Sequence, residues 1–126
     1  MGTAKSKPNW EKLRLALAIR ASMRCEGCGL PFEPHPVYGF SASHRMPRGA
    51  GIKAPWIHGL ANLVLLCGQG SETNTCHGKC KAEFDESLAN GWVISRYDKR
   101  LPSEIPVLLH SGWYLLDDEG NKTRIG

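Results

Sequence analysis

Four cysteines in two spaced pairs constrain this chain more than any other feature of its sequence. Two residues separate Cys25 from Cys28, and eight separate Cys67 from Cys76. A two-residue spacing lets two thiolates reach the same metal ion, and four thiolates in two pairs are typical of a closed structural zinc site. The turn-rich stretch between the second pair can loop out and bring Cys76 back. The pattern therefore predicts a four-cysteine zinc clip that joins two distant parts of the chain.

A fifth cysteine, Cys80, follows Cys76 by one helical turn. This spacing would allow it to compete as a ligand. A free cysteine is more often a small buried apolar side chain, and we expect that role for Cys80.

The length and composition are those of one globular domain. The chain has 126 residues, of which 41% are hydrophobic and 22% charged, and a domain of this size can bury a real core. It contains neither an apolar run near the roughly 20 residues of a membrane span nor an apolar signal segment after the basic N-terminus. We expect a cytoplasmic protein without a membrane partner. Cysteines at these spacings bind metal more often than they form disulfides in that compartment, which argues against a disulfide-stapled secreted domain.

The net charge of +4 is concentrated in the first half of the chain. A basic front half suits a polyanion such as nucleic acid, because neutralising phosphates supplies much of the affinity. A solvated basic face with a role only in solubility explains the charge equally well, so charge alone leaves both interpretations open.

The apolar spacing predicts two helices and several short strands, an α+β arrangement. Residues 1–8 read as a disordered basic tail. Asn9 caps the first expected helix, over residues 10–23, and Asn74 or Thr75 caps the second, over residues 76–90, with Phe84 and Leu88 in the core. The expected strands or extended segments cover residues 30–42, 61–66, 92–94, 106–109, 113–116 and 122–125, the last two joined by a hairpin turn.

Three polar residues stand out because of where these elements place them. His44 ends a strand, Asn62 lies near the start of the next, and His77 opens the second helix directly after Cys76. The other histidines have no motif around them, and we expect His58 to be a loop residue without a catalytic role.

Taken together, these motifs resemble the HNH endonuclease family, and most closely the small HNH proteins of tailed bacteriophages. The resemblance covers about residues 24–120. It rests on Cys25-x2-Cys28, Ser43-His44-Arg45-x-Pro47-Arg48-Gly49-x-Gly51, the run Ala61-Asn62-Leu63-Val64-Leu65-Leu66-Cys67, Cys76-His77-Gly78, and two tail segments at residues 91–96 and 112–120.

The resemblance implies a ββα-metal fold, in which a β-hairpin and a helix hold one divalent cation. Within a single domain over residues 9–126, it implies an HNH core over about 24–91 that carries the zinc clip. An N-terminal helix precedes this core, and a C-terminal β-hairpin extension over 92–126 follows it. That extension is either structural or an interaction module.

The resemblance also assigns roles to the three polar residues in the hydrolysis of DNA phosphodiester bonds, by nicking or double-strand cutting. His44 corresponds to the general base, since a neutral imidazole can take a proton from water. Asn62 orients that imidazole or pins the loop. His77 binds the catalytic cation, which is Mg²⁺, Mn²⁺ or another first-row metal and neutralises charge on the scissile phosphate.

Two positions depart from the family pattern. Ser43 stands where the family often has Asp or His as a second metal ligand, and a neutral hydroxyl is a weaker ligand. Lys81 stands where the family often has a further His. These departures leave His77, with Ser43 as a weak second ligand, and predict weakened metal binding rather than loss of activity.

DNA is the implied partner, with Arg45, Arg48 and Lys53 as candidate phosphate contacts. A phage-encoded nuclease of this kind would act in the host bacterial cytoplasm, and a terminase partner in DNA packaging follows from family analogy alone. The alternative function is a non-catalytic zinc-ribbon DNA-binding module or a degenerate nuclease. The presence of His44, Asn62 and His77 in order favours the nuclease.

Overall fold

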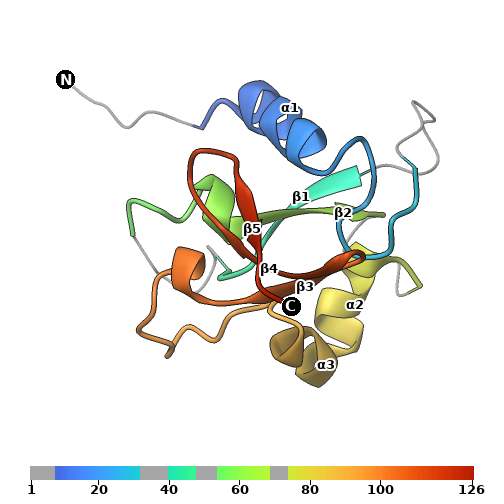
Figure 1. Cartoon of the computed structure of the whole chain (residues 1–126). Helices are drawn as coiled ribbons and strands as arrows, with labels where there is room; N and C mark the ends of the chain where they lie inside the picture. The colour runs from blue at the N-terminus through green and yellow to red at the C-terminus, as the bar shows by residue number, and fades with distance from the viewer. Residues whose placement is uncertain (1–7, 32–39, 48–53, 69–73) are drawn as a thin grey trace.

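The structure is a computed structural model that describes residues 8–31, 40–47, 54–68 and 74–126. It confirms a mixed α+β fold, in which the helices and two small antiparallel sheets alternate along the chain (Figure 1). No helix within these residues is long and apolar enough to cross a membrane. The elements are α1 (Trp10–Arg20), β1 (Phe40–His44), η2 (Leu60–Asn62), β2 (Leu63–Cys67), α2 (Cys76–Ala82), α3 (Phe84–Ala89), η3 (Pro102–Glu104), β3 (Val107–Leu109), β4 (Gly112–Leu116) and β5 (Lys122–Arg124).

Helix α1 begins as expected and ends earlier than expected. The Asn9 side chain accepts a hydrogen bond from the Lys12 N–H at 3.2 Å, which caps the first turn. Leu17 is fully buried and belongs to the same hydrophobic cluster as Leu63 and Leu65. The helix stops at Arg20 rather than near residue 23, because Ser22 and Met23 have φ values of 55° and 60°, outside the helical region.

Strand β2 is the centre of the fold, and it is buried along its whole length. It pairs antiparallel with β1, so that His44 lies opposite Leu63 and Phe40 opposite Cys67. Successive side chains of a strand point to opposite faces. Accordingly, Leu63 and Leu65 pack towards α1, whereas Val64 and Leu66 pack with residues of the C-terminal sheet. Both faces of β2 are therefore covered, which explains why its consecutive residues are all apolar.

The expected single helix over residues 76–90 is instead two helices. Glu83 separates α2 from α3 with φ −125° and ψ 62°, which is not helical. Across this break, the Ser87 hydroxyl donates to the Lys79 carbonyl at 3.0 Å and joins the two helices. Phe84, expected in the core, is the first residue of α3 after this break and is 49% exposed.

The C-terminal region contains the expected β3–β4–β5 meander, but residues 92–94 do not form the expected strand. Their N–H groups bond elsewhere: those of Trp92 and Val93 donate to the Ser87 carbonyl, and that of Ile94 donates to the Arg45 carbonyl. In the meander, Asp117 Oδ1 accepts from the N–H groups of residues 119 and 121 and closes the predicted turn.

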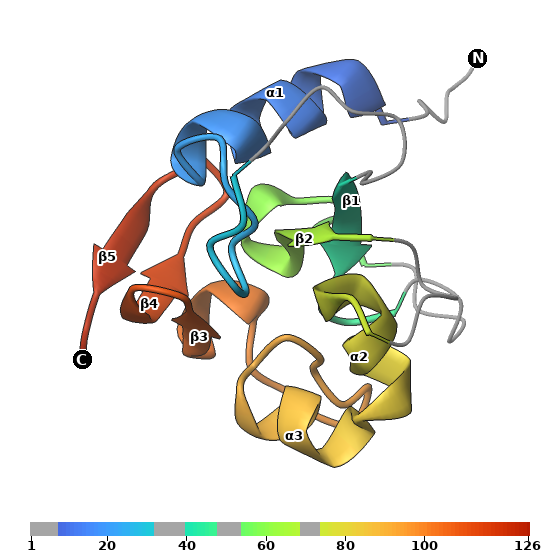
Figure 2. The ribbon, with the colours of Figure 1, turned by 90° about the vertical axis from the view of Figure 1, so that its right-hand side faces the viewer.

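The extension and the cysteine-bearing segments share one hydrophobic cluster. Trp92, Val107 and Tyr114 from the extension pack together with Cys25 and Val64. Residues 92–126 therefore complete the core rather than stand apart from it. Figure 2 shows the same arrangement from the side, with the β1–β2 sheet between α1 and α2 and the C-terminal sheet next to it.

Candidate active site and metal centre

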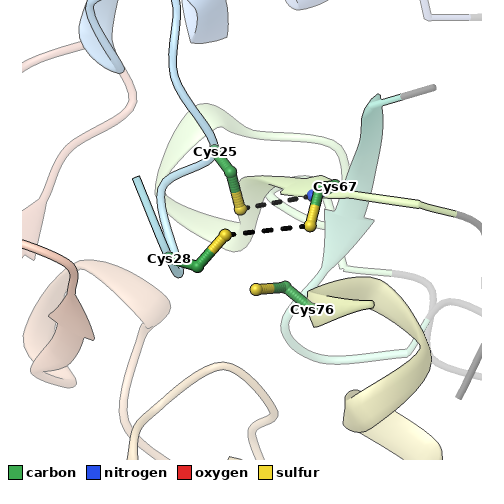
Figure 3. A group of neighbouring side chains, drawn as sticks. All are labelled: Cys25, Cys28, Cys67 and Cys76. Atoms are coloured by element: carbon green, nitrogen blue, oxygen red, sulfur yellow. Dashed lines mark hydrogen bonds between the residues drawn. The ribbon is translucent and has the colours of Figure 1, made fainter. Parts of the chain in front are cut away.

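The four cysteines predicted to form a clip converge on one point (Figure 3). Cys25 and Cys28 lie in the turn after α1, Cys67 ends β2, and Cys76 begins α2. Their Sγ atoms all lie within 4.8 Å of one another, and those of Cys28 and Cys67 are 3.9 Å apart. A tetrahedral zinc site with Zn–S bonds of about 2.3 Å would place the sulfurs roughly 3.8 Å apart. The cluster could hold a metal ion, and its geometry is compatible with structural zinc.

The electrostatics of the cluster also suit a cation. The pKa of Cys25 is lowered to about 5, first by a hydrogen bond from the Cys76 thiol and further by the N–H groups of residues 28, 67 and 27. That bond to Cys25 raises the pKa of Cys76, and burial raises the pKa of Cys67 to about 11. Burial and repulsion from the neighbouring sulfurs thus oppose a negative charge on Cys67 and Cys76. A dication offsets that repulsion, and binding releases the remaining protons.

Gly27 allows the turn between Cys25 and Cys28 to form, a role that the cysteine spacing alone did not predict. A Cβ atom on Gly27 would lie 2.7 Å from the Trp92 ring and 3.1 Å from the Cys76 Sγ. The Trp92 ring is fixed in turn, because its Nε1–H donates to the Leu108 carbonyl at 2.7 Å. The turn thus closes against the tryptophan only with glycine at this position.

Cys80 does not belong to the four-cysteine group. It is half-buried, packs against the hydrophobic cluster that contains Cys25 and Cys67, and its sulfur lies 3.7 Å from the Cys76 carbonyl oxygen. Burial raises the pKa of its thiol. These contacts agree with the predicted role of a small apolar side chain.

A second site lies at the His44 end of β1, where a cavity of about 360 Å³ opens between α1, β1 and α2. His44 enters it from the last position of β1, and His77 enters it from the first turn of α2, whose N-cap is Thr75. The structure therefore brings together two of the three polar residues expected at the active site. The cavity is lined by Trp10, Arg14, Ala42, Ser43, His44 and His77.

One nitrogen of the His77 ring is available as a ligand within the part of the chain that the structure describes. Its Nδ1 atom is buried and has no hydrogen-bond partner among those residues. Burial lowers the pKa of its imidazole, an effect that the nearby Gly68 carbonyl partly opposes. The ring is thus neutral at neutral pH, which is the form that binds metal ions. The two residues expected to hold a catalytic cation, His77 and Ser43, both line this cavity, although the Ser43 side chain also forms a hydrogen bond with the Cys80 thiol.

Asn62 is buried completely and cannot reach a substrate. Its Oδ1 accepts from the Met46 N–H at 2.9 Å, and its Nδ2 donates to the carbonyls of Met46 and Ile57 at 3.2 and 2.9 Å. These bonds agree with the second of the two roles expected for Asn62, that of pinning the loop. They connect the segment just after His44 to the segment just before His58.

His58 is the residue of this site for which the sequence predicted no role. Its Nδ1 lies 2.9 Å from Nε2 of His44, and the two ring centroids are 5.1 Å apart. Trp10 packs edge-to-face against both rings, at 5.7 Å from His44 and 5.3 Å from His58. No local motif marks His58, because the contact arises only when the loop between β1 and η2 closes.

The expectation that Arg45 contacts DNA phosphates is wrong. Its side chain is 0% exposed, and burial lowers the pKa of its guanidinium to about 9, so it remains a cation at neutral pH. It donates hydrogen bonds of 2.7–3.0 Å to four backbone carbonyls, those of Gly91, Ala61, Pro102 and Ile105. Arg45 is a structural residue that ties the end of β1 to the C-terminal region.

A second basic residue of the front half is also buried. Arg20 forms a 2.7 Å ion pair with Glu26 and donates to the carbonyls of Leu60 and Leu63. Arg48 and Lys53, the other two candidate DNA contacts, lie outside the described residues. Arg14, which is exposed and lines the cavity, is the basic residue that the structure places beside His44 and His77.

No protein-family model matches this chain, and neither a curated protein nor a solved structure gives a significant match.

Proposed function

We propose that this protein is a metal-dependent endonuclease of the HNH type that hydrolyses phosphodiester bonds of DNA. The observation that carries the proposal is the cavity in which His44 and His77 meet at the end of a two-stranded antiparallel sheet. His44 comes from β1 and His77 from α2, and β2 lies between them in the chain. The four-cysteine cluster brings the end of β2 next to the start of α2.

In this proposal His44 is the general base. It takes a proton from a water molecule, the resulting hydroxide attacks phosphorus, and one ester bond breaks while its leaving oxygen takes a proton from solvent. A divalent cation held by His77 and Ser43 would neutralise charge on the phosphate when bound. The four cysteines hold a structural zinc ion, which keeps α2 in place against β2.

The experiment that tests this function is relaxation of supercoiled plasmid by the zinc-loaded protein, with magnesium or manganese titrated. We expect metal-dependent nicking or cutting by the wild type. His44→Ala should reduce the rate by about a hundred- to ten-thousand-fold, as loss of a positioned base does. His77→Ala should instead raise the metal concentration needed for half-maximal rate, because Ser43 is a poor replacement ligand.

Equal cleavage by wild type and His44→Ala would refute the assignment of His44 as base. Circular dichroism and zinc content serve as controls, since neither histidine belongs to the cysteine cluster and both variants should match the wild type.

Arg14 replaces Arg45 as the phosphate contact of this proposal, because it is exposed and lines the same cavity. DNA binding should weaken steeply as salt rises. Arg14→Gln should lower the affinity and reduce the magnitude of the slope of log K against log salt by about 1. Arg124→Gln, an exposed arginine on β5, is the matched control and should leave that slope unchanged. An affinity that does not depend on salt would contradict the proposal.

One observation favours a second candidate, a DNA-binding module that retains the fold without the chemistry. The side chain before His44 is a buried serine hydroxyl, a weak ligand, so if His44 serves as the base, His77 is the one strong metal ligand left among the described residues of the cavity. In the same plasmid assay, binding without cleavage at any metal concentration would select this candidate.

A further inference from the structure

We propose that His58 is a positioning residue for His44, which fixes the proton of the neutral His44 ring on Nε2 and so directs its lone pair to Nδ1. The inference deepens the proposed nuclease function and rests on it, because the base role of His44 decides which of the two rings donates in their contact. The placement of the proton itself is a property of the folded protein, and it can be measured without cleavage.

The argument begins with the 2.9 Å contact between Nε2 of His44 and Nδ1 of His58. A neutral imidazole carries one N–H and one lone pair, so one ring donates in this contact and the other accepts. If His44 is the base, it must offer a lone pair to water. Because its Nε2 is engaged with His58, that lone pair is on Nδ1 and the Nε2–H donates to His58. The proton of neutral His58 then resides on its own Nε2.

The same contact would assist the reaction as it proceeds. When Nδ1 of His44 accepts the proton of water, the ring becomes an imidazolium with a proton on each nitrogen. Its hydrogen bond to His58 is then charge-assisted and stronger than before. His58 thus stabilises the protonated base more than the neutral base, without touching the substrate.

The backbone around His58 is held firmly enough for this role. Asn62 donates to the carbonyl of Ile57, the residue before His58, and also binds Met46, two residues after His44. The Gly59 N–H donates to the Trp56 carbonyl at 2.8 Å and closes the turn that carries His58. Asn62 therefore acts on His44 at a distance, through the loop that carries His58.

One further contact restricts the pair directly, and a second holds the chain next to the histidine loop. Trp10 packs against both rings and limits their rotation. Asp118 comes from the C-terminal turn and accepts from the Ala61 N–H at 2.9 Å. A Cβ on Gly59 would lie 2.6 Å from an Asp118 oxygen, so a side chain at position 59 would displace the Asp118 carboxylate.

Two substitutions distinguish a positioning role from packing. His58→Asn places an amide oxygen near the position of Nδ1 and can still accept from His44, whereas His58→Leu fills similar space without an acceptor. We expect His58→Leu to lower the single-turnover cleavage rate by roughly ten- to a hundred-fold. His58→Asn should recover most of this loss. DNA affinity, zinc content and the metal concentration for half-maximal rate should be unchanged in both.

The second measurement is ¹⁵N NMR of the histidine rings in the zinc-loaded full chain, without DNA or added magnesium. At about pH 8.5, where ordinary imidazoles are neutral, His44 should be an Nε2–H tautomer in the wild type and in His58→Asn. In His58→Leu it should show a mixture of the two tautomers.

The results separate this inference from the proposed function. An unchanged His44 tautomer in His58→Leu overturns the inference, even if the wild type cleaves DNA. Equal rate losses in His58→Leu and His58→Asn also overturn it, because they indicate packing alone. A tautomer change in a protein that shows no cleavage supports the placement of the proton and refutes the nuclease function.

Discussion

Cys28→Ser is expected to leave the protein without zinc and without a stable fold. Cys28 is the one exposed member of the four-cysteine cluster, so serine at this position removes a ligand while costing little packing. Structural zinc in small domains contributes about 10–16 kcal/mol of apparent binding free energy, and a whole domain is stable by only about 5–15 kcal/mol. A large part of the stability therefore depends on the clip.

The measurements for this prediction are zinc content after purification without added metal, and thermal unfolding followed by circular dichroism. Wild-type protein should contain about one equivalent of zinc, and removing it with a strong chelator should reproduce the behaviour of Cys28→Ser. Cys80→Ser is the matched control and should retain both zinc and the cooperative transition. A Cys28→Ser protein that unfolds at the wild-type temperature would show that the cluster contributes no metal-linked stability.

Arg45→Met is expected to have the second large effect, on folding rather than on DNA binding. Methionine occupies much of the arginine volume but donates no hydrogen bond, so the buried carbonyls of Gly91, Ala61 and Ile105 lose the donor that the structure gives them. The Pro102 carbonyl keeps a hydrogen bond from the Ile105 N–H. Each unsatisfied buried polar group costs about 1–3 kcal/mol. The sum over three carbonyls, about 3 kcal/mol or more, is a large part of the stability of a domain of this size.

Urea unfolding monitored by tryptophan fluorescence measures this loss. Arg124→Met, on the exposed strand β5, is the control and should change the free energy of unfolding by less than about 0.5 kcal/mol. An Arg45→Met protein that unfolds like the wild type and binds DNA less tightly would contradict the structural role and identify Arg45 as a phosphate contact.

The sequence predicted the parts of this protein that depend on local spacing. The cysteine pairs predicted the cluster, the run of apolar residues predicted β2, and the turn signals predicted the C-terminal meander. His44 and His77 were placed correctly because each lies at the end of an element whose boundary the sequence marks.

What the sequence did not predict depends on contacts between distant residues. Arg45 looks like any surface arginine, and its burial follows from carbonyls that come 16 to 60 residues later in the chain. His58 reaches His44 only through the loop that Asn62 closes. The N–H groups of residues 92–94 are bound by Ser87 and Arg45, so this apolar segment does not join a sheet.

The burial of β2 on both faces has a consequence for how the protein opens. Helix α1 covers one face and the C-terminal sheet covers the other, so neither layer can detach without exposing the apolar side chains of this strand to water. Local opening around β2 therefore costs nearly as much free energy as global unfolding. The amide protons of β2 should therefore exchange with solvent only when the whole molecule unfolds. Their exchange rates should then give the free energy of global unfolding.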